Sequence, residues 1–308
     1  MTSYLARRVL ALVPVALGVA TITFALIHLV PGDPVVAMLG DMAAPADIEG
    51  MRHELGLDHP LWQQYAAFLG GLATGDLGES ISMREPVAHL IAQHFPATLE
   101  LALAGLVVAI AIAFPLGVIA GANPNGPADL GAMGFAVLGI SIPHLYLGPL
   151  LMILFSLKLR WLPLTGRGGF SHLILPALTL GTALAAILAR MLRQSLAQVR
   201  ESDFMRTAIG KGLSANAALM RHGLRNALTP VVTILGLQLG GLLTGSIITE
   251  VIFSWPGLGR LMITAISARD YPLVEGCVLT FALTYVLVNM ATDIAYGLID
   301  PRVRIEGA

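Results

Sequence analysis

The side chains best placed to bind a partner gather in one basic segment between two long apolar runs. From 200 to 230 the sequence reads RESDFMRTAIGKGLSANAALMRHGLRNALTP. Its cations are Arg200, Arg206, Lys211, Arg221 and Arg225. A polar loop this long, basic and patterned for helix, indicates a docking surface on the cytoplasmic side of a membrane. Physics alone leaves two partners open, a protein and the anionic lipid that attracts basic loops.

Residues that could do hydrolytic or redox chemistry form no recognisable pattern. The segment Gly210–Gly212 reads GKG but lacks the upstream Gly and the Ser/Thr of a phosphate-binding loop. His28, His144 and His172 are scattered near the ends of apolar runs, where structural roles are expected. Nucleophile elbows, paired carboxylates and clusters of metal ligands do not stand out. We therefore expect no catalytic residue, no metal site and no cofactor bound by this chain.

The composition points to an integral membrane protein. The chain has 308 residues, of which 56% are hydrophobic and 12% charged, and its mean hydropathy is +0.78. Soluble domains carry about 25% charged residues, so this chain has too few charges to cover a soluble globule. Its one cysteine, Cys277, lies in an apolar run and is expected to be a small buried hydrophobe.

Six apolar runs are near the length of about 20 residues that crosses a bilayer. They are Val9–Val30, Leu101–Ala122, Leu130–Leu157, Leu173–Ala189, Thr229–Thr249 and Gly276–Ile299. The expected fold is therefore all-α and polytopic, with about six transmembrane helices. Asp293 interrupts the last run, and we expect it to face a neighbouring helix or a subunit interface.

The distribution of Lys and Arg sets the orientation, because cytoplasmic loops are enriched in them. The loop 190–229 holds seven of the 18, which predicts that this loop and both termini are cytoplasmic. The predicted parts are an N-terminal anchor helix at 1–30, an extracytoplasmic segment at 31–97, a five-helix core at 98–300 and a tail at 301–308. In the second part, LWQQYAAFLGGLATGDLG predicts a short amphipathic helix that ends at a Gly-rich turn.

Inside the basic segment, the pattern predicts two short helices joined by a turn. Gly212 can adopt the left-handed conformation that ends a helix, and Ser214 suits the N-cap of the next helix. Arg221 and Arg225 are four residues apart and share one face. A separate apolar stripe at helical spacing is formed by Leu213, Ala217, Met220 and Leu224.

This segment resembles the cytoplasmic "EAA" loop of ABC importer permeases in the dipeptide/oligopeptide branch, which typically reads D-Y-x-R-T-A-x-A-K-G-L and then R-H-x-L-R-N-A-L-x-P. The matching residues are Asp203, Arg206, Thr207, Ala208, Lys211, Gly212, Leu213, His222, Leu224, Arg225, Asn226, Ala227, Leu228 and Pro230. Phe204 and Gly210 depart from the pattern. HLVPGDPV, ELGLDHPLWQQY, GDLGES, PATLELA, TEVIFSWPGLGR and LIDPRVR are also typical of the branch, so the resemblance covers nearly the whole chain. The turn 122–130, unlike that of relatives, has no Lys or Arg.

The resemblance implies a type I ABC importer-like permease fold in the bacterial inner (plasma) membrane. It implies that the loop 194–229 docks into a cleft of a cytoplasmic ATPase subunit, where ATP and Mg act. The implied partners are two such ATPase subunits, a second homologous permease and an extracytoplasmic substrate-binding protein. The implied coupling residues are Asp203, Arg206, Thr207, Ala208, Lys211, Gly212, Leu213, His222, Leu224 and Arg225.

An external loop at 254–273 is also implied, with Glu250, Phe253, Pro256, Gly257 and Gly259 shaping the outer gate or receiving the binding protein. A rigid Pro-Gly turn that only closes a helix pair is the alternative. The glycines of the fifth run allow close helix approach, either along the pathway or against the partner permease. They are Gly236, Gly240, Gly241 and Gly245.

The expected function is the permease subunit of an ATP-driven importer of di- or oligopeptides, forming half of the pathway. Relatives imply nickel, glutathione, haem or an oligosaccharide as other solutes. An ion-coupled secondary transporter is the alternative from a different class, but it predicts charged midplane residues and inverted repeats that are not evident. A membrane scaffold is the remaining alternative, and it would not need a capped pair of cytoplasmic helices.

Overall fold

The computed structural model describes residues 13–25, 35–36, 44–54 and 56–299. The described part of the chain is helical, and its only β pairing is an isolated bridge between Glu79 and Pro86. Both predicted termini, including the tail 301–308, lie outside the described residues, as does His28. Of the predicted first span, Val13–Ala25 is an apolar helix and the remainder is outside.

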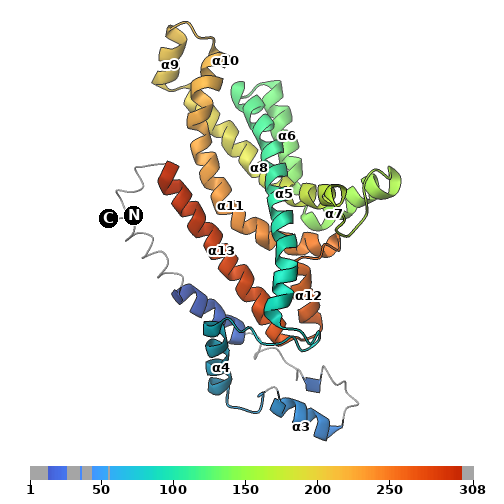
Figure 1. Ribbon diagram of the computed structural model, residues 1–308. Helices are drawn as coiled ribbons and strands as arrows, with labels where there is room; N and C mark the ends of the chain where they lie inside the picture. Colours follow the sequence, from blue (N-terminus) through green and yellow to red (C-terminus); the bar gives the residue numbers. More distant parts are fainter. Residues whose placement is uncertain (1–12, 26–34, 37–43, 55, 300–308) are drawn as a thin grey trace. The chain divides into compact units, whose positions relative to one another are not determined.

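The helices follow one another along the chain, and the longer connections between them include 75–86 and 159–169 (Figure 1). They are α3 (Pro45–Glu54), α4 (Leu61–Thr74), α5 (Val87–Ala122), α6 (Pro127–Ser141), α7 (His144–Leu151), the π-helix η1 (Met152–Lys158), α8 (Phe170–Arg200), α9 (Asp203–Gly210), α10 (Ala215–Ala218), the π-helix η2 (Leu219–Gly223), α11 (Leu224–Ile252), α12 (Leu258–Ser267) and α13 (Tyr271–Ile299).

Four stretches are long and apolar enough to cross a membrane: Val87–Ala122, Phe170–Arg200, Ala215–Ile252 and Tyr271–Thr292. They confirm four of the expected spans. Phe170–Arg200 is the most enclosed, with 61% of its apolar window buried against 22% to 33% for the others. Large apolar side chains on the outer helices remain exposed, as lipid-facing side chains are in a polytopic membrane protein.

The expected span Leu130–Leu157 is not a straight helix. The chain bends by 102° between α6 and the pair formed by α7 and η1. The bend follows from Pro143, which pushes the residue before it out of the helical region; Ile142 has φ −96° and ψ 111°. Counting the bent pair as one span gives five in the described residues. The sequence predicted the apolar length of this region, and the bend is a feature that it did not predict.

The chain divides into two compact units. The first comprises residues 1–98 and 256–286. A core of buried side chains holds it together: Val87, Leu90, Ile91, Leu258, Leu261, Ala265, Leu273 and Cys277. As predicted, α4 is a short helix that ends at glycine, since Gly75 takes the left-handed conformation with φ 79°.

In the same unit, a buried carboxylate lies just before α13 and joins it to an earlier part of the chain. Asp270 accepts hydrogen bonds from the hydroxyls of Ser80 (2.6 Å) and Ser82 (2.7 Å), and from the backbone N–H of Leu273 (3.2 Å). Burial alone would raise the pKa of Asp270, but the hydrogen bonds from Ser80 and Ser82 outweigh it and hold the pKa below its usual value. Asp270 thus caps α13 and ties residues 80–82 to it.

The second unit comprises residues 99–255 and 287–308. In it α8 packs against α6 on one side and α11 on the other, so it is the central helix of the unit. At the end of α8 and the start of α11 the chain forms α9 and α10 (Figure 1). The basic segment is therefore carried by two long helices that are themselves packed together.

Candidate functional site

The candidate site comprises α9, α10, η2 and the first two residues of α11, which we call the coupling segment (residues 203–225). Only Glu201 and Ser202 separate α8 from α9, and Ser202 is the extended N-cap residue of α9. On the inner side of α9, Met205 is 1% exposed. Because so short a connection leaves little slack, a displacement of α9 must act directly on α8.

A tight turn at Gly212 joins the two helices. Gly212 has φ +94°, which L-residues with a side chain rarely adopt, and its N–H donates to the Ile209 carbonyl at 2.9 Å. The next helix is capped by Ser214, whose Oγ accepts from the N–H of Ala217 at 3.3 Å. Both features predicted for this turn, the left-handed glycine and the serine N-cap, are confirmed.

The outer face of the coupling segment is charged and exposed. Its charged and polar members are Asp203, Arg206, Thr207, Lys211, Arg221, His222 and Arg225. Arg206 Nη1 lies 3.5 Å from Asp203 Oδ1, and both side chains are exposed to solvent. This ion pair therefore contributes little to the stability of the fold. Ala208, Leu213 and Leu224 are half-buried, and Gly212 itself is exposed. The predicted coupling residues therefore lie on α9, on the turn around Gly212, in η2 and at the start of α11.

Large apolar side chains share this exposed surface. Phe204, Ile209 and Met220 are exposed by 42%, 44% and 50%. Exposed apolar groups rimmed by polar ones mark a surface that another molecule covers. Their presence favours a protein groove over lipid headgroups alone, since cations suffice for the latter.

The buried face of the second helix differs from the predicted stripe. Ala217 and Met220 are exposed, whereas Ala218, Leu219, Gly223 and Ala227 are buried. The offset is already present in α10, where Ala217 is exposed and Ala218 is buried, and it continues through η2, where Leu219 and Gly223 are buried. The α-helical spacing in the sequence thus selected the neighbouring residues.

The sequence did not predict the contact through which α9 packs against α8 and η2. Gly223 lies against Leu219, Val199 of α8 and Met205 of α9; a Cβ built on it would stand 3.5 Å from the Met205 sulfur and 2.9 Å from Leu219 Cδ1. The small residue thus lets α9 pack close to the start of α11. Met205 occupies a variable position inside the motif, and that is why the pattern did not mark it.

The residues predicted for an external gate are mostly inaccessible. Glu250, Phe253, Gly257 and Gly259 are buried and Pro256 is half-buried. The Glu250 carbonyl accepts from the N–H of Trp255 at 2.9 Å, which closes a tight turn after α11. This burial favours a rigid closing turn, or a gate, over a surface that receives another protein.

Two of the α11 glycines pack inside the second unit. A Cβ on Gly236 would lie 2.0 Å from Thr292 Cγ2 of α13, and one on Gly245 would lie 3.3 Å from Leu180 of α8. Gly240 is buried, while Gly241 has open space around it. Close helix approach therefore accounts for Gly236 and Gly245 within this chain. The side chain of Asp293 lies outside the described residues.

Other polar groups do not assemble into a catalytic or metal centre in the described part of the chain. His144 Nδ1 bonds the Thr179 carbonyl at 2.7 Å and so links α7 to α8. His172 has a buried Nδ1 without a hydrogen-bond partner. Among the residues described, no group of three or more His, Cys, Asp or Glu could hold a metal ion.

Comparison with known families gives two matches that together span almost the whole chain. Residues 113–305 match the binding-protein-dependent transport system inner membrane component, and residues 1–102 match the N-terminal membrane component of such systems.

Two curated relatives are similar over full length. The chain is 44% identical to the di/tripeptide transport system permease protein DppB of Pseudomonas aeruginosa, over 99% of each chain. It is 43% identical to the glutathione transport system permease protein GsiC of Escherichia coli, over 99% of this chain and 100% of the relative.

Solved structures share the fold at low identity. The inward-facing MetNI methionine ABC transporter superposes with a TM-score of 0.57 and 16% identity, over 71% of this chain and 100% of that one. An amino acid ABC transporter gives 0.52 and 16%, over 70% and 94%. At this identity the likeness concerns the fold alone, and it agrees with the expected permease architecture.

Proposed function

The chain belongs to the family of inner membrane components of binding-protein-dependent transport systems, and on that premise we propose that it is the permease subunit of an ATP-driven importer of short peptides. Membership makes it a multi-pass inner-membrane ABC importer permease. The peptide substrate rests on the two full-length relatives, one named for di- and tripeptides and one for glutathione, itself a short peptide.

The observation that carries the mechanical part of the proposal is the coupling segment. Its outer face combines cations, such as Arg206 and Arg225, with exposed Phe204, Ile209 and Met220. Such a mixed surface suits a groove on a protein partner, with apolar anchors surrounded by a polar rim. We assign this surface to a cytoplasmic ATPase subunit, on which ATP and Mg act, because the chain itself has no phosphate-binding loop.

Force transfer follows from stiffness. The turn at Gly212 is fixed by its N–H bond to Ile209, and α10 is capped by Ser214. A push on α9 therefore reaches α8 and α11 instead of being absorbed by a loose loop. On this account both chain termini are cytoplasmic, a second homologous permease completes the pathway, and a binding protein delivers peptide from outside. Residues 250–259 close the outer end as a gate.

The first test is purification of the tagged chain from its own membranes in mild detergent, with mass spectrometry of what accompanies it. We expect a P-loop ATPase and a second permease of similar size. Charge reversal at Arg206 and Arg225 should remove the ATPase, while the matched reversal at Arg52 in α3 should keep it. A lone chain or a homo-oligomer from intact membranes would contradict the proposal.

Substrate class needs a second test. Vesicles containing the assembly and its binding protein are given radiolabelled alanyl-alanine or glutathione together with MgATP. ATP-dependent uptake of alanyl-alanine supports the di- and oligopeptide assignment. Uptake of glutathione alone would narrow the substrate to that tripeptide, and uptake of neither would contradict peptide import.

A further inference from the structure

A buried ion pair joins the turn between α5 and α6 to the far end of α8. Asp129, in the first turn of α6, is 2% exposed. Its two carboxylate oxygens accept from Nε and Nη2 of Arg193, each at 2.6 Å. The backbone N–H of Asn125 also donates to Asp129, at 2.7 Å. Bidentate pairs between an arginine and a carboxylate are among the strong hydrogen-bonded contacts in proteins.

A second arginine of α8 donates a hydrogen bond to the same turn. Arg200 Nη1 donates to the carbonyl of Ala122, the last residue of α5, at 2.7 Å. Carbonyls at a helix C-terminus lack a partner within the helix and favour a cation. We call Asp129, Arg193, Arg200 and the Ala122 carbonyl the α8 clamp. The turn 122–130 has no Lys or Arg of its own, so its positive partners come from α8.

Beside the clamp, α5 and α8 pack with almost no space between them. A Cβ on Gly117 would lie 2.8 Å from Leu192 Cβ, and one on Gly121 would lie 2.7 Å from Leu196 Cβ. Such contacts bring two helix backbones close and oppose sliding. The end of α5, the first turn of α6 and the end of α8 therefore form one tightly packed body.

This packed body is joined to the coupling segment through the C-terminal end of α8. Arg200 is the last residue of α8, and α9 begins three residues later. A displacement of α9 must first move the clamp end of α8. With the ion pair intact, α6 has to follow α8, because separation would leave the buried Asp129 carboxylate without its cation, while the Arg193 side chain is 28% exposed.

We propose that Asp129 and Arg193 are positioning residues of the transport cycle: they transfer the movement of α9 from α8 to α5 and α6. The inference rests on the proposed function, since it needs an ATPase that moves α9. It goes beyond that function by assigning the transfer to a residue pair outside the coupling segment. Loss of the pair lets α8 move while α6 stays behind, so ATP is spent without peptide movement.

A purely structural role makes a different prediction. If the pair only stabilises the fold, its loss lowers the amount of active assembly, and uptake and ATP hydrolysis fall in the same proportion. The informative quantity is therefore the ratio of peptide imported to ATP hydrolysed, which does not depend on how much assembly is present.

The experiment measures that ratio in vesicles that hold the full assembly, with radiolabelled alanyl-alanine and glutathione as probes. For Asp129→Asn we expect a fall of about tenfold, within the usual range of coupling between sites, with ATP hydrolysis retained. Arg193→Lys keeps the charge but loses the bidentate geometry. Its ratio of peptide imported to ATP hydrolysed should therefore lie between those of the wild type and Asp129→Asn. The exchange D129R/R193D should recover much of what Asp129→Arg alone loses.

The matched control is Glu49→Gln, which breaks the exposed pair of Glu49 with Arg52 in α3 and should leave the ratio unchanged. Should Asp129→Asn fail to insert, Arg193→Lys gives the same test. An unchanged ratio in the clamp variants, or a proportional fall of uptake and hydrolysis, overturns the inference alone. A wild-type assembly without ATPase or uptake overturns the proposed function, and the inference with it.

Discussion

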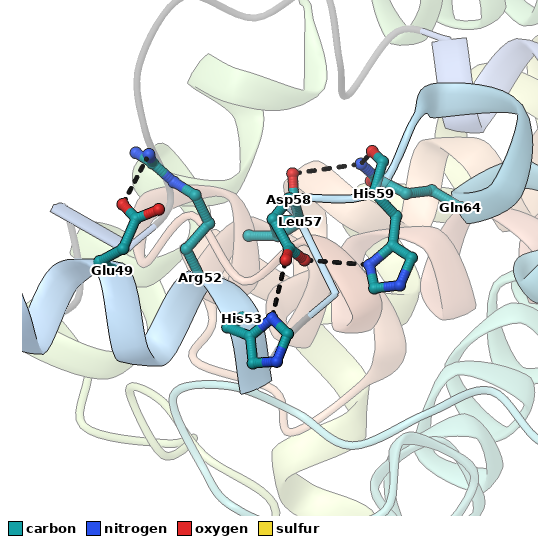
Figure 2. A network of polar contacts seen from close by, with 7 residues as sticks. All are labelled: Glu49, Arg52, His53, Leu57, Asp58, His59 and Gln64. Atoms are coloured by element: carbon teal, nitrogen blue, oxygen red, sulfur yellow. Dashed lines mark hydrogen bonds and ion pairs between the residues drawn. The ribbon is translucent and has the colours of Figure 1, made fainter.

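Two carboxylates, Asp129 in the second unit and Asp58 in the first, meet nitrogen-bearing side chains in opposite environments. The Asp129 side chain is 3% exposed and held by a guanidinium that is always charged. Asp58 is exposed and lies between two imidazoles, with Nδ1 of His53 at 2.7 Å and Nδ1 of His59 at 2.9 Å (Figure 2). One contact is permanent and enclosed, while the other depends on protonation and is open to water.

The two environments differ in how much the loss of a hydrogen-bonding partner costs. Water can replace the partners of an exposed carboxylate at small cost, whereas a buried carboxylate that loses its partner keeps an uncompensated charge. Figure 2 also shows Gln64 bonded to the carbonyls of Leu57 and His59, so backbone contacts hold this connection as well. The α8 clamp should therefore govern stability and coupling, and the network around Asp58 only local order.

The largest expected effect is at the clamp. Arg193→Met leaves Asp129 buried without its partner and should destabilise the assembly by about 3–5 kcal/mol. The double change D129L/R193M removes both charges and should recover most of that loss. Apparent Tm values of the purified assembly in detergent check both. Equal Tm values for the wild type and Arg193→Met would show that the pair is not enclosed.

A smaller effect is expected at Asp270, which is buried but bonded to hydroxyls and N–H groups instead of a cation. Asp270→Asn loses charged hydrogen bonds to Ser80 and Ser82, and should cost about 2–3 kcal/mol. The reduced pKa adds a pH test: this stability is present above the unfolded-state pKa and is lost as pH falls through the lower folded pKa. Acid titration of Tm should therefore be flatter for Asp270→Asn.

The smallest effect is expected at the Asp58 network, where no change in Tm should appear. The hydrogen bond from Asp58 raises the pKa of His53, and the hydrogen bond from His53 lowers the pKa of Asp58. The contact is strongest when both are charged, above the usual Asp pKa and below the usual His pKa, and it weakens as pH rises through the raised pKa of His53.

Hydrogen exchange over residues 53–60 should thus show more protection at pH 5 than at pH 8, after correction for intrinsic rates. The variant Asp58→Asn should remove that difference, while Glu49→Gln should retain it. A pH effect that survives Asp58→Asn would mean that another group orders this segment.

The sequence was informative wherever one residue dictates a local geometry. Gly212 and Ser214 marked the turn and the cap of the coupling segment, and the Gly-rich end of α4 was predicted in the same way. Apolar length likewise located the long helices, because lipid requires it. The docking role came from the resemblance and stays a proposal, which the exposed apolar and basic groups support.

The features that the sequence did not reveal depend on contacts between residues far apart in the chain, or on local geometry without a sequence pattern. Asp129 and Arg193 are 64 residues apart, and each alone resembles an ordinary loop or helix charge. The buried face at Ala218 and Leu219 is set by packing and lies beside the predicted positions Ala217 and Met220. The bend at Pro143 interrupts an apolar run whose composition is that of a straight span.

The central claim, that ATP hydrolysis drives this permease through the coupling segment, is tested most directly at Gly212. Proline cannot adopt φ +94° and removes the N–H bond to Ile209, so Gly212→Pro should loosen the turn. Gly210→Ala is the matched control, because its added methyl meets nothing within 4 Å. We predict that Gly212→Pro inserts and its ATPase still hydrolyses ATP while peptide uptake is lost, and that Gly210→Ala behaves as wild type. Normal uptake by Gly212→Pro would contradict the account.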